Sequence, residues 1–162
     1  MPATTIKSRR VVRTYRQTID ASPEIVFPLL CPVREVEWLN GWAFKMVYSA
    51  SGLIEEGAVF TTSFDEPETV WLVTRHDSSA GVVEFARVTP QSRTCLLKLA
   101  VTPDGDHRTH VDVSYAYTSL GHAGDAFLES WTKEAFLDEV KFWEKSMNHF
   151  VKTGERLGRD PS

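Results

Sequence analysis

Apolar and polar side chains alternate along much of the middle of the chain, which is the pattern of antiparallel strands with one buried face. The alternation is clearest from Val111 to Tyr117, where every odd-numbered residue is Val or Tyr. Turn-forming residues, most clearly Asp104 and Gly105, separate successive runs. The pattern therefore predicts strands at 43–49, 58–65, 69–76, 82–89, 93–102 and 110–118.

The segment before these strands predicts one more strand and two short helices. Residues 9–20 are rich in β-branched side chains and lack Gly and Pro, as in a strand. Pro23 follows Ser22 as in the first turn of a helix. Pro28 and Pro32 cannot continue a helix interior, so we expect two short helices broken near Pro32 and ended by Asn40 and Gly41.

The last third of the chain predicts one long amphipathic helix from Asp125 to Thr153. This stretch contains neither Gly nor Pro, and Phe136, Val140 and Trp143 recur at steps of three and four. Residues 155–162 look like a flexible tail. We therefore expect a single domain over 1–162, with its core at about 9–154.

Composition narrows the function without naming it. The 162 residues carry a net charge of −4, which argues against nucleic acid as a partner. No apolar run is long enough for stable membrane insertion, and the N-terminal residues lack the apolar stretch of a secretory signal. Cys31 and Cys95 cannot form a disulfide framework. We expect a cytoplasmic protein.

Sequence motifs for metal, phosphate and nucleotide binding are missing from the chain. There is no CxxC pair, HExxH, GxSxG, phosphate loop or dinucleotide glycine fingerprint. His107 and His110 are an odd number of positions apart on a predicted strand, so they point to opposite faces. We expect no metal and no cofactor.

Several segments together resemble one superfamily. They are IDASPEIVFPLL, CPVREVEWLNGW, YSASGLIEEGAVFTT, VSYAYTSLG and the helix terminus at 136–154. The chain resembles the START-like, or SRPBCC, superfamily of lipid-transfer domains, polyketide cyclases and plant ligand binders. CPVREVEWLNGW is similar to an uncharacterised bacterial subgroup. The resemblance implies an α+β helix-grip fold, in which a curved seven-stranded antiparallel sheet wraps around the C-terminal helix.

The resemblance also implies a cavity between the sheet and the long helix. Strand alternation and the helical stripe indicate which side chains face it. The predicted ligand-binding residues are Trp38, Phe60, Thr62, Phe64, Trp71, Phe85, Arg87, Leu97, Leu99, Tyr115, Tyr117, Glu139, Val140 and Trp143. A solid aromatic core is the alternative interpretation of the same pattern.

Two acids and one arginine are candidates for chemistry in this cavity. Glu139 falls within the apolar helix stripe and needs a partner, water or solvent at the stripe edge. Glu35 precedes Trp38 by one helical turn and is placed at the cavity mouth, or is a first-turn acid favoured by the helix dipole. Arg87 shares the parity of Phe85, so it points inward to an acid or an anionic ligand, or else lies exposed on a twisted strand.

The preferred functional hypothesis is a module that binds a small, largely hydrophobic molecule, lipid-like or polyketide-like. One alternative is an enzyme of the polyketide cyclase or dehydrase type, with Glu35 and Glu139 as candidate catalytic groups. Another is a protein-interaction module with a filled core. No nucleophile and base constellation is visible, so the sequence does not require catalysis, and it leaves a homodimer open.

Overall fold

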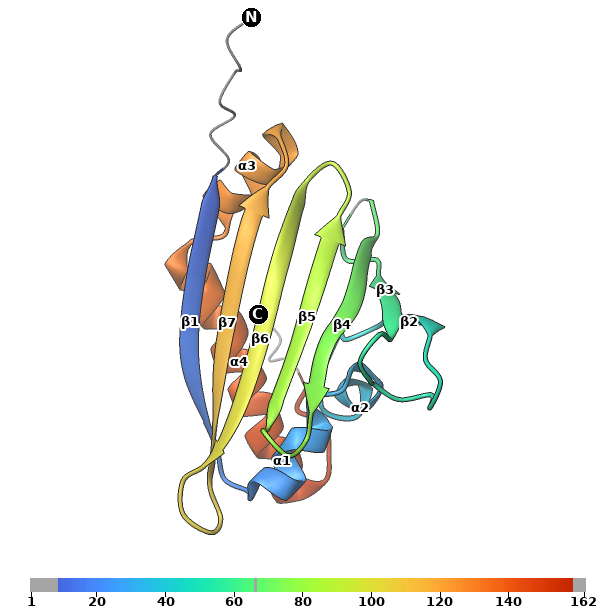
Figure 1. The fold of residues 1–162 in the computed structure, drawn as a ribbon. Helices are drawn as coiled ribbons and strands as arrows, with labels where there is room; N and C mark the ends of the chain where they lie inside the picture. The colour runs from blue at the N-terminus through green and yellow to red at the C-terminus, as the bar shows by residue number, and fades with distance from the viewer. Residues whose placement is uncertain (1–8, 66, 159–162) are drawn as a thin grey trace, which may run out of the picture.

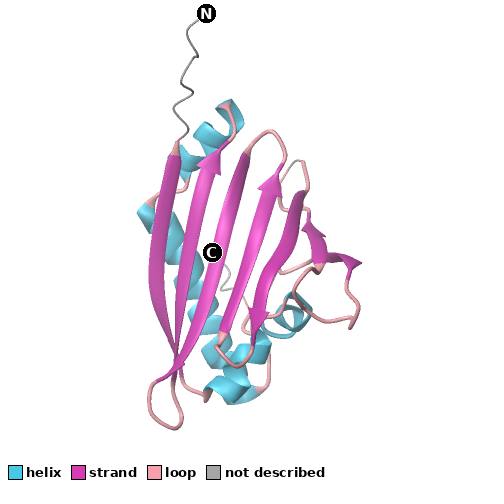
Figure 2. Cartoon of the chain, viewed as in Figure 1, coloured by secondary structure: helices cyan, strands magenta, loops and turns pink. Residues whose placement is uncertain are grey.

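The computed structural model describes residues 9–65 and 67–158, which form one antiparallel sheet with helices at its inner face and ends (Figures 1 and 2). In chain order the elements are β1 (Arg10–Ile19), α1 (Pro23–Leu29), α2 (Pro32–Trp38), β2 (Lys45–Tyr48), β3 (Val59–Thr62), β4 (Thr69–Asp77), β5 (Val82–Thr89), β6 (Arg93–Pro103), β7 (Thr109–Ser119), α3 (His122–Ser130) and α4 (Lys133–Thr153).

The strands follow one another as a meander, except that the first strand closes the sheet beside the last. The spatial order is β1-β7-β6-β5-β4-β3-β2, with every neighbouring pair antiparallel. Figure 1 shows α4 lying along one face of the curved sheet, with α1 and α2 beneath its lower end. This arrangement confirms the predicted seven-stranded sheet, the two short helices after the first strand and the long C-terminal helix.

Register directs the predicted side chains to the inner face. Phe60 lies opposite Trp71, which lies opposite Arg87, so three adjacent strands present these side chains in one row. The row continues through Cys95 to Tyr117. Because side chains alternate along a strand, the next inward row contains Phe85, Leu97 and Tyr115.

Side-chain hydrogen bonds hold α4 at the β1 edge of the sheet. The hydroxyl of Tyr15 donates to Oε1 of Glu144 at 2.8 Å, and the backbone N–H of Thr18 donates to the other oxygen of that carboxylate. Gln17 Nε2 donates to the carbonyl oxygen of Val140 at 3.0 Å. These bonds attach α4 at one edge of the sheet.

The single helix predicted over 125–153 is in fact two helices, which corrects the sequence analysis. The chain leaves the helical conformation at Trp131, and Thr132 begins α4 by accepting a hydrogen bond from the backbone N–H of Ala135 at 3.1 Å. Gly154 ends α4 in the left-handed conformation, with φ of 74°, as a C-terminal glycine commonly does. Within the described ranges, no helix combines the length and apolarity needed to cross a membrane.

Proline begins both short helices as expected, but α1 continues through Pro28, which the sequence analysis excluded from a helix interior. Both α1 and α2 carry Pro in their first turn. Trp38, at the end of α2, is fully buried and donates its indole N–H to the carbonyl oxygen of Leu29 at 3.0 Å. This bond fixes α2 against α1, so the loop after α2 projects toward the open part of the sheet.

Candidate functional site

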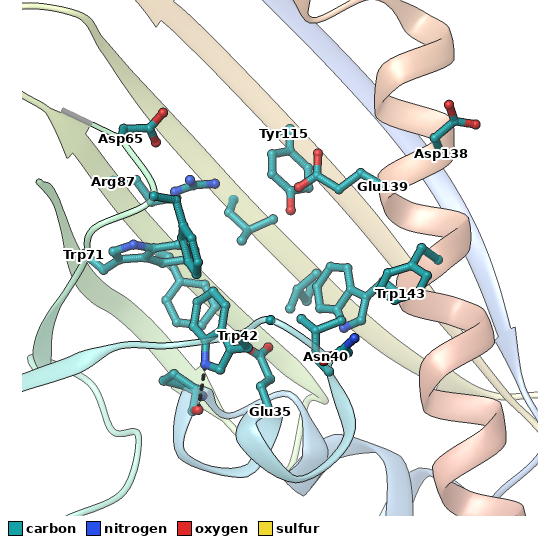
Figure 3. A pocket seen from close by; sticks show the side chains of 18 of the residues that line it. Glu35, Asn40, Trp42, Asp65, Trp71, Arg87, Tyr115, Asp138, Glu139 and Trp143 are labelled. Atoms are coloured by element: carbon teal, nitrogen blue, oxygen red, sulfur yellow. Dashed lines mark hydrogen bonds between the residues drawn. The ribbon is translucent and has the colours of Figure 1, made fainter. Parts of the chain in front are cut away.

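A cavity of about 730 Å³ lies between the inner face of the sheet, α4, α2 and the loop at 39–42 (Figure 3). Its size falls within the range of pockets that enclose small molecules, roughly 300–1,000 Å³. Apolar side chains make up most of its wall, and a few ionisable groups project into it. The space between sheet and helix is therefore hollow at this end of the molecule.

Most of the residues predicted from sequence come together around this cavity. Those that line it are Glu35, Phe60, Phe64, Trp71, Phe85, Arg87, Leu97, Leu99, Tyr115, Tyr117, Glu139 and Trp143. The alternation of side chains along β6 and β7 therefore predicted correctly which of them reach the cavity.

Three predicted residues do not line the cavity. Trp38 is packed behind it, with its ring stacked on that of Trp143 at a centroid distance of 6.2 Å. The hydroxyl of Thr62 is turned to the indole N–H of Trp71, and Val140 is fully buried in the part of α4 that is attached to β1. These side chains belong to the packed core, because an inward direction does not separate core from cavity.

Two tryptophans of the wall were missed by the sequence analysis. Trp42 lies in the loop after α2, where its indole N–H donates to the carbonyl oxygen of Pro32 at 2.9 Å. Trp131 lies at the break between α3 and α4, with its ring edge-on to Tyr117 at 4.6 Å. Their aromatic character was the available signal, but Trp42 lies in a loop and Trp131 lies where α3 ends rather than within the single helix predicted over 125–153.

Exposed residues of the wall mark the mouth of the cavity. Phe64 is 58% exposed, and Asp138 and Lys145 lie on the exposed surface of α4. Leu157 and Gly158, in the predicted tail, also border the cavity. Arg156 donates to the carbonyl oxygen of Val36 at 3.4 Å, so residues 155–158 lie beside α2, and residues 159–162 of the predicted tail fall outside the described residues.

The walls of the cavity are aromatic surfaces in two groups. Phe60 stacks on Trp71 at 5.0 Å near β3 and β4. At the opposite side, Trp131 contacts Tyr115 and Tyr117, with centroid distances of 5.9 and 4.6 Å. Aromatic pairs at these separations are favourable contacts, and an aromatic wall suits a flat or apolar molecule.

Arg87 and Arg93 bring two guanidinium groups to the same side of the cavity. Arg87 lies over the ring of Trp71 at 4.1 Å and donates to the hydroxyl of Tyr117 at 3.4 Å. Arg93 lies over the ring of Phe127 at 3.5 Å, and its Nη2 is 3.1 Å from Oδ2 of Asp65. The sequence allowed Arg87 an inward or an exposed position, and the structure places it inward.

Glu35 projects from α2 into the cavity wall (Figure 3). Part of its surface is open to the cavity, yet protein surrounds it, and this desolvation raises its pKa to about 8. A carboxyl group with that pKa is mostly protonated at neutral pH. Glu35 is therefore a hydrogen-bond donor or a proton carrier there rather than a fixed negative charge.

Glu139 extends from α4 toward the hydroxyl of Tyr115 (Figure 3). Glu139 is an exposed residue, yet the protein around its carboxyl raises its pKa by desolvation, while the positive charge of Arg87 and a hydrogen bond from Trp131 oppose that rise. Burial likewise raises the pKa of Tyr115, and the nearby Glu139 charge adds to the effect. This pair offers a ligand hydrogen-bonding groups opposite Arg87.

The ionisable side chains of the site do not form a metal centre. Across residues 9–65 and 67–158, no group of three or more His, Cys, Asp and Glu side chains is placed to hold a metal ion. The cavity of the described residues therefore offers hydrogen bonding, charge and aromatic contact as its chemistry.

Solved structures with a similar fold are known, although their sequences differ widely from this chain. No protein-family model and no curated protein matches the chain. Among solved structures, norcoclaurine synthase from Thalictrum flavum, in complex with dopamine and hydroxybenzaldehyde, is similar with a TM-score of 0.66. The match covers 91% of this chain and 89% of that one, at 11% identity.

Two further structures agree with this comparison. Ara h 8.0201 has a TM-score of 0.65 at 11% identity, over 90% of this chain and 99% of its own. SA2116 from Staphylococcus aureus, a protein of unknown function, has a TM-score of 0.68 at 10% identity, over 93% and 98% of the two chains. At such low identity these matches establish the architecture alone. They confirm the helix-grip fold that the sequence predicted.

Proposed function

We propose that this domain binds a small, largely hydrophobic molecule, lipid-like or polyketide-like, in the cavity between the sheet and α4. The observation that carries the proposal is the cavity of about 730 Å³ with its mainly aromatic and aliphatic wall. A hollow of this kind is costly in a protein interior unless something occupies it, because each missing contact weakens packing. It also weighs against the alternative of a filled core.

The comparison with norcoclaurine synthase is consistent with this proposal. That protein shares the fold and its structure contains dopamine and hydroxybenzaldehyde, two small aromatic molecules. In the present chain, the hollow is lined by Trp71, Tyr115, Leu97 and Leu99 among others. This wall suits aromatic or aliphatic bodies of similar size.

Filling the cavity tests the proposal. Leu99 is 1% exposed and lies in the wall, so Leu99→Trp places an indole where a ligand would lie. The probe is N-phenyl-1-naphthylamine, a neutral dye whose fluorescence rises in an apolar site. We expect stoichiometric binding to the wild type and binding weaker by about tenfold or more in Leu99→Trp.

Leu96→Trp is the matched control. Leu96 lies on the same strand but points to the outer face of the sheet and is 44% exposed. This variant should bind the dye as the wild type does, with both variants checked for a native circular dichroism spectrum. Equal loss in both variants, or no stoichiometric binding by the wild type, would refute the cavity as a binding site.

A cyclase or dehydrase-type enzyme is the second candidate, and the acids of the wall favour it. A general acid or base works best when its pKa is near the working pH, and burial raises the pKa of Glu35 to about 8. Glu139 and Tyr115 lie across the cavity from Arg87, so a carbonyl compound between them would meet both a cation and proton donors.

Turnover separates the enzyme from the binder. The assay follows conversion of a panel of polyketone substrates by the wild type, Glu35→Gln and Glu139→Gln, with dye binding measured in parallel. An enzyme that uses these carboxyls should lose turnover in at least one variant and keep dye binding. If an identified substrate is converted equally by all three proteins, the carboxylate mechanism is wrong.

A further inference from the structure

Arg87 occupies the inner face because the register of the sheet leaves it no other position. It pairs with Trp71 on β4 and with Cys95 on β6, and both of those side chains are buried. Cys95 is small, so the Arg87 side chain extends past it as far as the hydroxyl of Tyr117 on β7. The guanidinium therefore lies above the sheet and borders the cavity.

Arg87 forms no ion pair within the described residues, although its charge acts on Glu139 across the cavity. No carboxylate of residues 9–65 and 67–158 lies within 4.0 Å of it, and its hydrogen bond to Tyr117 goes to a neutral hydroxyl. Its Nε is buried and has no hydrogen-bond partner in that same part of the chain. Arg87 is half-buried, and a guanidinium held partly out of water without an anion is unfavourable, since charges away from water are normally paired.

Arg93 provides the internal comparison. It borders the same cavity and also lies over an aromatic ring, but Asp65 neutralises it at 3.1 Å. Asp65 is thereby committed to Arg93. Both arginines border the cavity, but in the part of the chain that the structure describes Arg93 is ion-paired and Arg87 is not.

Glu139 does not fill this role for Arg87. It lies on α4, across the cavity (Figure 3), and the two side chains form no ion pair in the described part of the chain. The Glu139 side chain is also exposed, so water screens its charge. The space between the two groups is the cavity itself, so a ligand can meet Arg87 at one end and Glu139 with Tyr115 further along.

We propose that the ligand of this cavity is an amphipathic organic acid, whose carboxylate pairs with the Arg87 guanidinium and whose aromatic or aliphatic body lies against the rings of the wall. The proposal deepens the ligand-binding function and rests on it. A planar guanidinium presents parallel N–H donors that match the two oxygens of a carboxylate. The cation over Trp71 is already fixed in position, so little side-chain freedom is lost on pairing.

A pair of isosteric ligands tests the proposal. Naphthalene-2-carboxylate and naphthalene-2-carboxamide share one apolar body and differ in charge, and each is used at neutral pH to displace N-phenyl-1-naphthylamine. We expect the wild type to bind the acid at least about tenfold more tightly than the amide, the usual scale of a charge-assisted bidentate pair. Arg87→Met should bring this ratio close to one, and Arg87→Lys should leave an intermediate ratio.

Arg75→Met is the matched control. Arg75 lies on the neighbouring strand, is exposed and pairs with Asp77, so its loss should leave the ratio unchanged. Equal affinity of acid and amide for the wild type, or a preference that survives Arg87→Met, would overturn the proposal while dye binding still supports the cavity. If Arg87→Met does not fold, the wild-type ratio and Arg87→Lys decide. No dye binding by the wild type would remove the binding function itself.

Discussion

Replacing Glu35 with glutamine should make the stability of the protein less dependent on pH. Burial raises the pKa of Glu35 from its ordinary 4.5 to about 8. Between these values the folded protein keeps a proton that the unfolded chain has released. The free energy of unfolding therefore falls as pH rises through this window, and it levels off above the folded pKa. A glutamine has no proton to release, so Glu35→Gln removes this slope.

The size of the effect follows from the two pKa values. One pKa unit corresponds to about 1.36 kcal/mol, so a rise from 4.5 to about 8 sets an upper limit of about 5 kcal/mol. Glu35 keeps part of its surface open to the cavity, where water lowers the cost of its charge. We therefore expect the variant to gain about 2–4 kcal/mol over the wild type between pH 5 and pH 8.5.

Urea unfolding across this pH range measures the difference directly. The free energies of unfolding of the wild type and Glu35→Gln should be similar near pH 5 and diverge as pH rises, with the variant the more stable protein. Glu37→Gln is the control, because Glu37 lies on the same helix but is exposed in an ion pair with Arg34. Its offset should stay within about 1 kcal/mol at every pH.

The same pH dependence of stability in the wild type and in Glu35→Gln would refute the reasoning. If the difference between the wild type and Glu35→Gln stays constant within about 0.5 kcal/mol from pH 5 to pH 8.5, Glu35 titrates as an exposed carboxyl. The cavity wall around α2 would then be wet and open rather than enclosing.

Three further substitutions test contacts that hold the fold, each measured by urea unfolding. Thr132→Ala removes the cap of α4 and should cost about 1 kcal/mol, whereas no loss would mean that the cap is not needed. Gly124→Ala places a methyl group 2.0 Å from the carbonyl oxygen of Ser92, so α3 must shift at a cost of roughly 1–3 kcal/mol; unchanged stability would contradict that close approach. Tyr15→Phe deletes the hydroxyl that donates to Glu144 and should cost about 1–2 kcal/mol, and a neutral result would show that this bond does not fasten α4.

Much of the sheet could be predicted because a strand has one strict period. In β7, Val111 to Tyr117 alternate without exception, and turn residues such as Gly105 mark the end of each strand. The break between α3 and α4 could not be predicted in the same way. Nothing near Trp131 forbids a helix, and Thr132 has no acid three residues later to complete a capping box. The break depends on packing against β7, which one-dimensional patterns do not contain.

The residues of the candidate site could also be predicted only in part from sequence patterns. Leu97 and Leu99 were correctly predicted to line the cavity because the alternation of side chains along a strand gives the face to which each one points. Parity cannot tell a hollow from a packed core, so Trp38 was assigned to the cavity although it lies behind the wall. Trp42 was missed because a loop has no period to analyse. For Arg87, a long side chain could have turned back to solvent, and only its row of neighbours decides its direction.

The place of β1 beside β7 has a consequence for how the chain is made. β1 leaves the ribosome early, but the strand that pairs with it is completed only after β2 to β6 have emerged. Strands β2 to β7 pair with their neighbours in sequence, so each hairpin can form as it is synthesised. The pairing of β1 with β7 instead joins segments about 100 residues apart, and such non-local contacts form slowly. α4 is synthesised last, so the aromatic inner face of the sheet stays uncovered until the end of synthesis. A nascent chain halted before Lys133 would therefore expose that face and should be the species most prone to aggregate or to engage a chaperone.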